Sequence, residues 1–471
     1  MTHTEIFLIL SLIVGLYAAW NIGANDVSNA MGTSVGSKAL TLRQAVLIAA
    51  VFEFTGAVLF GSNVSETLQK SIINPEIFEN APYKLAIGML ASLLATGIWL
   101  QAATYFGLPV STTHSIVGAI VGFGCIIGGF DAVIWETVFS IAGSWILSPF
   151  LGGMISFALF TFLRQKIFYA SYPYRAAKRL MPFLVFAVAL VLSLIAMYKI
   201  IAPHSGFLVK IAVVLGISSV SGFIAFIALR YYKGPHTVPK TVTVKSSPLV
   251  KEVDQAKQHL LCLEKQTQGE MRYRVQDILE EVESLRYSLQ ENPHLELRNT
   301  EFIYVEKIFA ILQILSACLM AFSHGSNDVA NAIGPLAAIV SLVTTGAISV
   351  SGDIPLWILA LGGFGIVVGL ATWGWRVIET IGRRITELTP SRGFSAEFGA
   401  AATILLASRF GFPISTTHTL VGAVLGVGLA GGIGALNLKT IRDIVISWFI
   451  TIPAGAILSI ICYLIIEPLF L

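Results

Sequence analysis

Two short polar phrases occur twice in this chain, each time in the same order. The first, called here the Asn-Asp phrase, has the pattern Gly-x-Asn-Asp-Val-x-Asn-Ala. Its two copies supply Asn25, Asp26, Asn29 and then Asn327, Asp328, Asn331. At spacings of three and four residues, these side chains share one face of a helix. Carboxylate and amide oxygens are hard ligands that suit a small cation such as Na⁺, so the phrase indicates a cation site. The alternative is a polar clamp between neighbouring helices.

The second phrase, called here the Ser-Thr-Thr phrase, has the pattern Gly-x-Pro-x-Ser-Thr-Thr-His. Its two copies supply Ser111, Thr112, Thr113 and then Ser415, Thr416, Thr417. Proline disfavours a helix for the residue before it, and the serine is a natural N-cap for a helix that begins at the next threonine. Free backbone N–H groups, hydroxyls and the positive end of the helix dipole bind anions, phosphate above all. One copy alone could be a simple helix cap, whereas two facing copies would hold a tetrahedral oxyanion.

The two phrases together favour coupled transport. Two aspartates beside an anion would repel it, and cations held by the Asn-Asp phrases would neutralise this repulsion. Anion binding would then depend on the cation. Protonated aspartates would make H⁺ the coupling ion, but the oxygen ligands favour Na⁺. An anion channel without coupling is the alternative from another class.

Histidines close both Ser-Thr-Thr phrases, and they raise the alternative of a membrane hydrolase. His114 and His418 each follow a pair of hydroxyl residues, which is the composition of a nucleophile and its base. Serine and histidine are three residues apart on the same new helix, and no oxyanion-hole or metal motif accompanies them. We therefore expect these histidines to pack or hydrogen-bond near the site, and we expect that the chain is not an enzyme and needs no cofactor.

Two further acids lie in apolar stretches but are not duplicated. Glu53 aligns with Ile366 in the second copy of the surrounding sequence, and Glu397 aligns with Leu93 in the first. An unpaired acid within a membrane is costly, so each is expected to face a cavity, a cation or a polar partner. Both are candidate coupling acids, and a purely structural pairing is the alternative.

The composition requires a membrane protein. The chain has 471 residues, of which 55% are hydrophobic and only 12% are charged, against about 25% charged in soluble domains. Long apolar runs with few charges are typical of transmembrane helices. The net charge of +3 indicates no nucleic-acid surface. The four cysteines are scattered without metal-ligand spacing, so neither disulfides nor a zinc site are predicted.

The apolar stretches predict an all-α membrane protein with about twelve transmembrane helices, grouped as five, two and five. The predicted stretches are 5–35, 43–62, 84–106, 110–130, 132–163, 181–202, 206–229, 304–323 (continuing to 350), 355–375, 395–410, 414–434 and 441–466. The polar phrases interrupt these stretches, which predicts broken or re-entrant helices. Four segments follow: a first block of five spans (1–163), a basic loop with the intervening pair (164–231), a polar linker (232–303) and a second block of five spans (304–471).

The loop charges predict that the two blocks have opposite orientations. Residues 66–84 carry three acids and two lysines, whereas the aligned residues 376–392 carry four arginines and two glutamates. The other matched loops also change sign, and basic loops stay in the cytoplasm. We therefore expect an inverted repeat, the signature of a secondary transporter. Both termini would be outside the cell, and 164–180 and 232–303 would be cytoplasmic. Two unrelated channel-like halves are the alternative.

The linker contains two stripes of apolar residues at alternating spacings of three and four. Such stripes predict two amphipathic helices. With Gly269 between the stripes, we expect a small cytoplasmic helical hairpin.

The four phrases resemble those of the inorganic phosphate transporter (PiT) family, whose members include sodium/phosphate symporters. The matching segments are GANDVSNAMGTSVGSKALT, GLPVSTTHSIVGAIVG, GSNDVANAIGPLAAI and GFPISTTHTLVGAVLGVG. The resemblance implies cation-coupled import of phosphate across the plasma (inner) membrane by alternating access, twelve spans, inverted repeats and a homodimer. It also implies that the aspartates and the Ser-Thr-Thr residues surround phosphate and Na⁺. Other members are expected to use H⁺ or to move sulfate.

Overall fold

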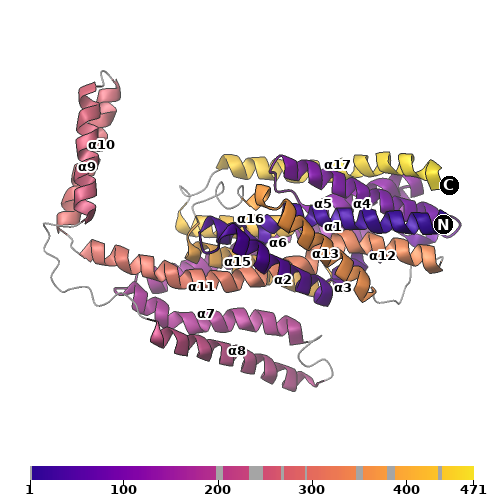
Figure 1. Cartoon of the computed structure of the whole chain (residues 1–471), viewed down its shortest axis with the longest axis horizontal. Coiled ribbons are helices and arrows are strands. Elements are labelled where there is room, and N and C mark those ends of the chain that lie inside the picture. Colours follow the sequence, from indigo (N-terminus) through magenta and orange to yellow (C-terminus); the bar gives the residue numbers. More distant parts are fainter. Residues whose placement is uncertain are drawn as a thin grey trace. The chain divides into compact units, whose positions relative to one another are not determined.

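The computed structural model describes residues 3–197, 205–232, 248–266, 270–291, 294–345, 354–378, 388–432 and 438–470. Across these residues the chain is helical, and its only β-structure is an isolated bridge between Ile73 and Val133. The first block contains α1 (His3–Gly36), α2 (Leu42–Phe60), α3 (Ser62–Lys70), η1 (Pro75–Phe78), α4 (Pro82–Tyr105), α5 (Thr112–Phe123), η2 (Gly124–Gly128), η3 (Phe130–Ala132) and α6 (Trp135–Leu163). Most of these helices run nearly parallel or antiparallel to one another (Figure 1).

The rest of the chain continues with long helices. The middle contains η4 (Arg164–Phe168), α7 (Pro173–Ala196), α8 (Phe207–Tyr231), α9 (Pro248–Gln266) and α10 (Glu270–Glu291). The second block contains α11 (His294–Asp328), α12 (Ala330–Thr345), α13 (Leu356–Thr372), α15 (Pro390–Arg409), α16 (Thr416–Gly431) and α17 (Leu438–Phe470).

Eight helices in the described part of the chain are long and apolar enough to cross a membrane, and three others are apolar but shorter. The chain is therefore an integral, multi-pass membrane protein. The predicted spans 110–130, 355–375 and 414–434 form the three shorter helices. Thr112–Gly128, the longest run of helix in the first of these, is about 25 Å long at ~1.5 Å per residue. A straight span across the ~30 Å hydrocarbon core needs more.

The Asn-Asp phrases interrupt only one of the two helices that carry them. α1 runs without a break through Asn25 and Asp26, whereas α11 ends at Asp328 and α12 begins at Ala330. In α1 the first residue of the phrase, Gly23, allows close packing: a Cβ at this position would overlap the backbone of Ile366 in α13. The first phrase therefore lies in a continuous helix, and its glycine allows the backbone of a neighbouring helix to approach.

Each Ser-Thr-Thr phrase lies at the tip of a helical hairpin, α4–α5 in the first block and α15–α16 in the second. The turns use Gly107 and Gly411, whose φ angles of 66° and 73° favour glycine. Ser111 and Ser415 are the N-caps of α5 and α16, and each hydroxyl accepts the backbone N–H of the histidine three residues on. Both helices thus begin at the threonine that the sequence predicts.

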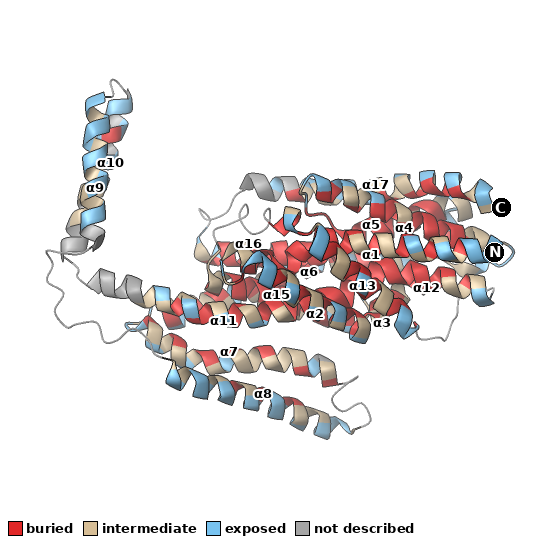
Figure 2. Ribbon diagram, viewed as in Figure 1, coloured by how far each residue is buried: buried red, intermediate tan, exposed pale blue. Residues whose placement is uncertain are grey.

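The chain divides into two compact units. Unit 1 contains Met1–Leu163, Phe183–Phe223 and Phe309–Leu471, so it includes almost all of both five-span blocks. Its buried residues line the interior of the helix bundle, on α1, α4, α5, α12, α15 and α16 among others (Figure 2). Asp353 and residues 379–387, whose charges contribute to the predicted orientation, lie outside the described residues.

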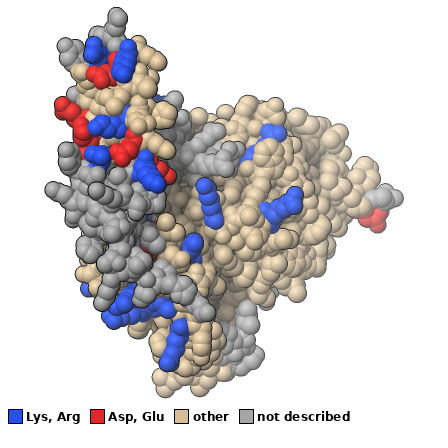
Figure 3. Space-filling view, turned by 60° about the vertical axis from the view of Figure 1, so that its left-hand side comes forward, with Lys and Arg blue, Asp and Glu red and all other residues tan. Residues whose placement is uncertain are grey.

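Unit 2 contains Arg164–Pro182 and Ile224–Ile308, and its main feature is the antiparallel pair α9–α10. Two ion pairs of 2.7 Å join these helices, Lys257 with Glu283 and Arg286 with Asp254. The hydrogen bond from Lys257 holds the pKa of Glu283 below its usual range. Acidic and basic side chains mix on this pair, whereas most of the remaining described surface in Figure 3 is uncharged. Gly269, the predicted turn, lies outside the described residues.

Candidate functional site

The N-termini of α5 and α16 meet inside unit 1. The Thr113 hydroxyl donates to the carbonyl of Ile414 at 3.0 Å, and the Thr417 hydroxyl donates to the carbonyl of Val110 at 3.2 Å. Each threonine therefore bonds the loop that precedes the other helix. The first backbone N–H groups of a helix have no partner within it. Two sets of such donors, both buried, are in this way brought to one place.

The first asparagine of each Asn-Asp phrase holds a hairpin tip of its own block. Asn25 Nδ2 donates to Thr104 Oγ1 at 2.9 Å and to the Leu108 carbonyl at 3.1 Å, and Asn25 Oδ1 accepts from the N–H of Val110. Asn327 Nδ2 makes the corresponding bonds to Ser408 Oγ and the Phe412 carbonyl. These bonds shape the site by fixing the loops before the Ser-Thr-Thr phrases. A role as cation ligands stays a prediction for both asparagines.

The last asparagine of each phrase reaches across to the other block. Asn29 Nδ2 donates to Thr417 Oγ1 at 2.8 Å, and Asn331 Nδ2 donates to Thr112 Oγ1 at 3.0 Å. The Oδ1 atoms of both asparagines are buried and accept no hydrogen bond in the described structure. Each helix N-terminus is therefore fitted with an amide from the opposite block, and two amide oxygens are left available.

The two aspartates lie against the neighbouring threonines Thr416 and Thr417 of α16. Asp328 Oδ2 accepts from Thr416 Oγ1 at 2.6 Å, and Asp26 Oδ1 accepts from Asn29 Nδ2 at 3.0 Å. Both carboxylates are completely buried, and each keeps one oxygen without a hydrogen-bond partner among the described residues, Oδ2 of Asp26 and Oδ1 of Asp328. The structure therefore places acids, amides and helix N-termini from both blocks in one buried cluster.

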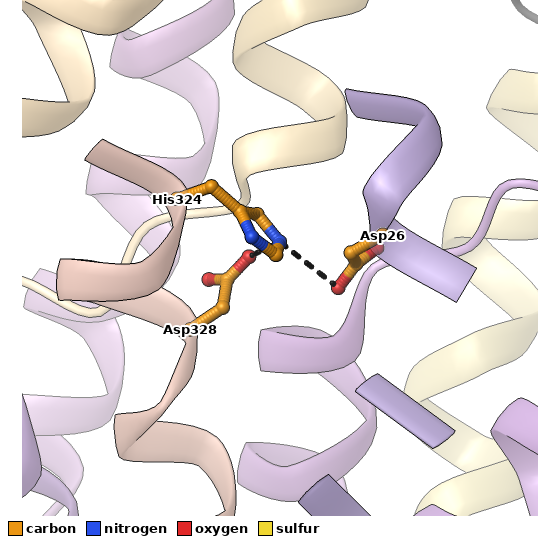
Figure 4. Close-up of side chains that lie close together, drawn as sticks. All are labelled: Asp26, His324 and Asp328. Carbon is orange, nitrogen blue, oxygen red and sulfur yellow. Dashed lines mark ion pairs between the residues drawn. The ribbon is translucent and has the colours of Figure 1, made fainter. Parts of the chain in front are cut away.

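His324 is a member of this cluster that the sequence interpretation misses. Its Nε2 lies 2.9 Å from Asp328 Oδ2 and 3.8 Å from Asp26 Oδ2, as Figure 4 shows. Its Nδ1 lies 3.3 Å from Glu53 Oε2, and all four residues are buried. The available signal was a histidine one helical turn before Asp328, at a position where the first block has Ile22. Glu53 thus has a titratable partner, one of the options predicted for it.

The same cluster has the geometry to hold a cation. Asp26, His324 and Asp328 each offer one ligand atom, and these atoms all lie within 4.8 Å of one another. Carboxylate oxygens are ligands for hard cations such as Na⁺, and an imidazole nitrogen extends the set toward transition ions. With the free amide oxygens nearby, the oxygen ligands predominate.

Glu397 lies in a second buried polar group, separate from Glu53. Its carboxylate accepts hydrogen bonds from Thr33 and Ser34 of α1 and from Gln313 and Ser316 of α11. The bonds from Thr33 and Ser34 are both 2.6 Å. Glu397 therefore has the polar partners predicted for a buried acid, supplied by the two helices that carry the Asn-Asp phrases.

These features define a membrane transporter: a multi-pass helical protein whose two blocks together surround a buried cluster of ionisable and polar groups. The model of the phosphate transporter family matches residues 22–459, and the chain belongs to this family. This confirms the family resemblance of the four phrases and the expectation that the chain is a transporter and not an enzyme.

Individual relatives are similar to this chain over nearly its whole length. The chain is 46% identical to a putative phosphate permease of Chlamydia pneumoniae, covering 98% of this chain and 99% of the relative. It is 44% identical to the chloroplastic inorganic phosphate transporter 2-1 of Arabidopsis thaliana, covering 97% of this chain and 72% of the relative. A solved structure, the sodium-dependent phosphate transporter, is 36% identical with a TM-score of 0.78, covering 98% of this chain and 99% of that one.

Proposed function

We propose that this chain imports inorganic phosphate coupled to Na⁺ by alternating access. Phosphate would bind between the N-termini of α5 and α16, with the Ser-Thr-Thr residues and the two aspartates around it. Na⁺ would bind at the Asn-Asp phrases. Glu53 and Glu397 would act as coupling acids. Family membership supports phosphate as the substrate, and the likeness to a solved sodium-dependent phosphate transporter supports Na⁺.

The observation that carries the proposal is the reciprocal bonding of the two blocks at the helix N-termini. Asn29 of the first block bonds Thr417 of the second, and Asn331 of the second bonds Thr112 of the first. The groups suited to a cation and those suited to an anion are therefore in direct contact. Occupancy of one site then changes the shape and the charge of the other.

Electrostatics gives the coupling its direction. Phosphate brings negative charge toward Asp26 and Asp328, which are buried where water cannot screen them. Cations bound beforehand would offset that charge, so phosphate would bind well only after Na⁺. Each Na⁺ that moves inward gains about 2.3 kcal/mol per 100 mV of membrane potential. Two or more cations would suffice to carry in a divalent anion.

The wider architecture belongs to the same proposal. Twelve spans arranged as two inverted repeats would allow the shared site to open alternately to either side. We place the protein in the plasma (inner) membrane as a homodimer, with both termini outside and with 164–180 and 232–303 in the cytoplasm. The reciprocal contacts of the two blocks support the repeat.

Uptake by purified protein in liposomes tests the proposal. Radiolabelled phosphate is offered under an inward Na⁺ gradient, an inward H⁺ gradient or no gradient. Accumulation above equilibrium only with Na⁺ is the expected result. Accumulation with H⁺ alone, or a preference for sulfate, would replace the proposal with an H⁺-coupled phosphate or sulfate permease. Downhill flux without any coupling would indicate an anion channel.

A further inference from the structure

Four aromatic rings from four different helices form a continuous series of ring contacts at the start of α5 and α16; the two contacts made by His114 are edge-on, and the contact of His418 with Trp448 is face to face. The order is Trp145 of α6, His114 of α5, His418 of α16 and Trp448 of α17. The successive ring centroids are 3.8, 4.3 and 3.6 Å apart. We call this arrangement the ring stack. Its two histidines belong to the two helices whose N-termini meet at the proposed phosphate site.

The ring stack bridges the two hairpin tips. His114 follows Thr113 directly and His418 follows Thr417, so each ring is attached to the first turn of its helix. Both histidines are buried, at 4% and 3% exposure. Trp145 Nε1 also donates to the carbonyl of Pro413 at 3.1 Å, which links α6 to the loop before α16. A change in the distance between the two helix N-termini would therefore have to disturb the ring contacts.

The histidines contribute to the ring stack through shape more than through hydrogen bonds. Nδ1 and Nε2 of His114 and Nε2 of His418 have no hydrogen-bond partner among the described residues, and His418 makes one hydrogen bond with the backbone of Trp145. A ring has few rotatable bonds and a fixed thickness, and aromatic contacts favour particular distances and angles. Two rings in contact, each packed against a tryptophan, therefore act as a rigid spacer between the two helix N-termini.

We propose that His114 and His418 are positioning residues that set the distance between the N-termini of α5 and α16. This distance determines which size of tetrahedral oxyanion fits between the two sets of backbone N–H groups and threonine hydroxyls. The histidines act through the turns that carry Thr113 and Thr417 and do not themselves contact the anion. The inference rests on the proposed phosphate site and adds the means by which that site selects its substrate.

The test compares removal of the rings with their replacement. The double variant His114→Ala/His418→Ala removes both rings, and His114→Phe/His418→Phe keeps them without ring nitrogens. Ser92→Ala is the matched control, because it removes a buried contact to Ser459 that lies away from the site. Equilibrium binding of radiolabelled phosphate to purified protein and uptake into liposomes are both measured, with arsenate and sulfate as competitors.

For the alanine variant we expect the KM and the Kd for phosphate to rise about tenfold or more, since displacements near 1 Å cost up to about 100-fold. The maximal rate and the Na⁺ dependence at saturating phosphate should change little. Arsenate, the larger tetrahedral oxyanion, should compete better than in the wild type. The ratio of phosphate to sulfate binding should hold, because these anions differ in charge more than in size. The phenylalanine variant should restore most of the affinity.

Two results would overturn the inference. One is a folded alanine variant with unchanged phosphate affinity and an unchanged phosphate-to-arsenate ratio. The other is a phenylalanine variant as impaired as the alanine variant, which would assign the role to the ring nitrogens. If the double alanine variant does not fold, the single variants, which each keep one imidazole, should show intermediate changes. A wild-type protein that neither binds nor transports phosphate would instead refute the proposed function.

Discussion

The two blocks of unit 1 share the same backbone contacts but carry their buried charge differently. A Cβ at Gly23 would overlap the backbone of Ile366, and a Cβ at the equivalent Gly325 would overlap the backbone of Glu53. The helix pairs α1–α13 and α11–α2 therefore approach equally closely. At the second of these crossings the structure has the His324–Glu53 pair, with His324 Nδ1 3.3 Å from Glu53 Oε2.

At the first crossing the aligned residues are both apolar. Ile22 takes the position of His324, Ile366 takes the position of Glu53, and both isoleucines are buried. Glu397 shows the same one-sidedness, because it aligns with Leu93. The duplicated residues thus build a frame with two equivalent sides, whereas the single-copy residues make Asp26 and Asp328 chemically unequal.

The largest effect on transport is expected from the duplicated aspartates. Asp26→Asn and Asp328→Asn each remove a buried negative charge that a cation would neutralise. We expect Na⁺-driven phosphate uptake to fall at least about 100-fold in either variant, equivalent to about 2.7 kcal/mol. Uptake into liposomes, measured as a function of Na⁺ concentration, checks this. Asp131→Asn, at an exposed acid, is the control. Normal transport with unchanged Na⁺ dependence in both site variants would refute the role of these acids.

The second prediction concerns stability, and it distinguishes the α11–α2 crossing, which has His324 and Glu53, from the apolar α1–α13 crossing. His324→Gln or Glu53→Gln alone leaves a buried partner without its counterpart, which costs about 3–5 kcal/mol. The double variant should therefore lose less than the sum, with a coupling of about 0.5–3 kcal/mol. Unfolding of the purified protein by heat or denaturant measures these free energies.

The apolar crossing supplies the control for that cycle. Ile22→Val and Ile366→Val should each cost about 0.5–1.5 kcal/mol. Contacts between neighbouring apolar groups should give these two variants much weaker coupling than the His324–Glu53 pair. Equal coupling at the two crossings would mean that the His324–Glu53 pair adds nothing to the second one.

The third prediction concerns what the blocks share. Gly23→Ala and Gly325→Ala should destabilise the protein by similar amounts, because each added Cβ meets the backbone of the crossing helix. Overpacking of this kind typically costs about 1–3 kcal/mol or more. Thermal unfolding of both variants checks the equality. Gly143→Ala, where an added Cβ meets nothing within 4 Å, should be neutral or slightly stabilising. A large difference between Gly23→Ala and Gly325→Ala would show that the frame itself is unequal.

The smallest effect is expected at Glu397. Ser34→Ala removes one of four side chains that donate to this carboxylate, so we expect a loss of about 1 kcal/mol. Ser11→Ala is the control at the symmetry-equivalent position. Ser11 occupies the position equivalent to Gln313, and among the described residues its hydroxyl bonds only the Phe7 carbonyl of its own helix. The unfolding free energies of the two variants check the difference. A larger effect at Ser11 would contradict the view that, among the described residues, only the position of Glu397 and not that of the aligned Leu93 has such a polar group.

Much of the site could be predicted because its elements follow local rules. The cap at Ser111 depends on a proline, a serine and the N–H group three residues on, all within a few positions. The apolar stretches predicted a membrane protein, because their preference for lipid over water depends on composition and not on tertiary contacts. The predicted stretches 110–130 and 414–434 run only a few residues past the observed helices, Thr112–Gly128 and Thr416–Gly431, because apolar residues continue beyond each helix end.

Contacts between distant residues could not be predicted in this way. The phrases suggested a division between a cation group and an anion group, but Asn29 bonds Thr417 and so joins the two. His324 looked like a single histidine in an apolar stretch, and only the crossing of α11 with α2 brings it to Glu53. Asn25 has the same residue type as Asn29 but bonds its own hairpin tip, since it faces another neighbour.

By itself, the sequence determined a helical membrane transporter with two related blocks, the helix N-termini that carry the hydroxyls, and the two aspartates. These features depend on residue type, on spacing within a helical turn and on transfer from water, all of which act locally. Only the tertiary structure decided which asparagine meets which threonine, that a histidine joins the aspartates, and that the same histidine contacts Glu53. Those outcomes depend on how helices hundreds of residues apart pack against one another.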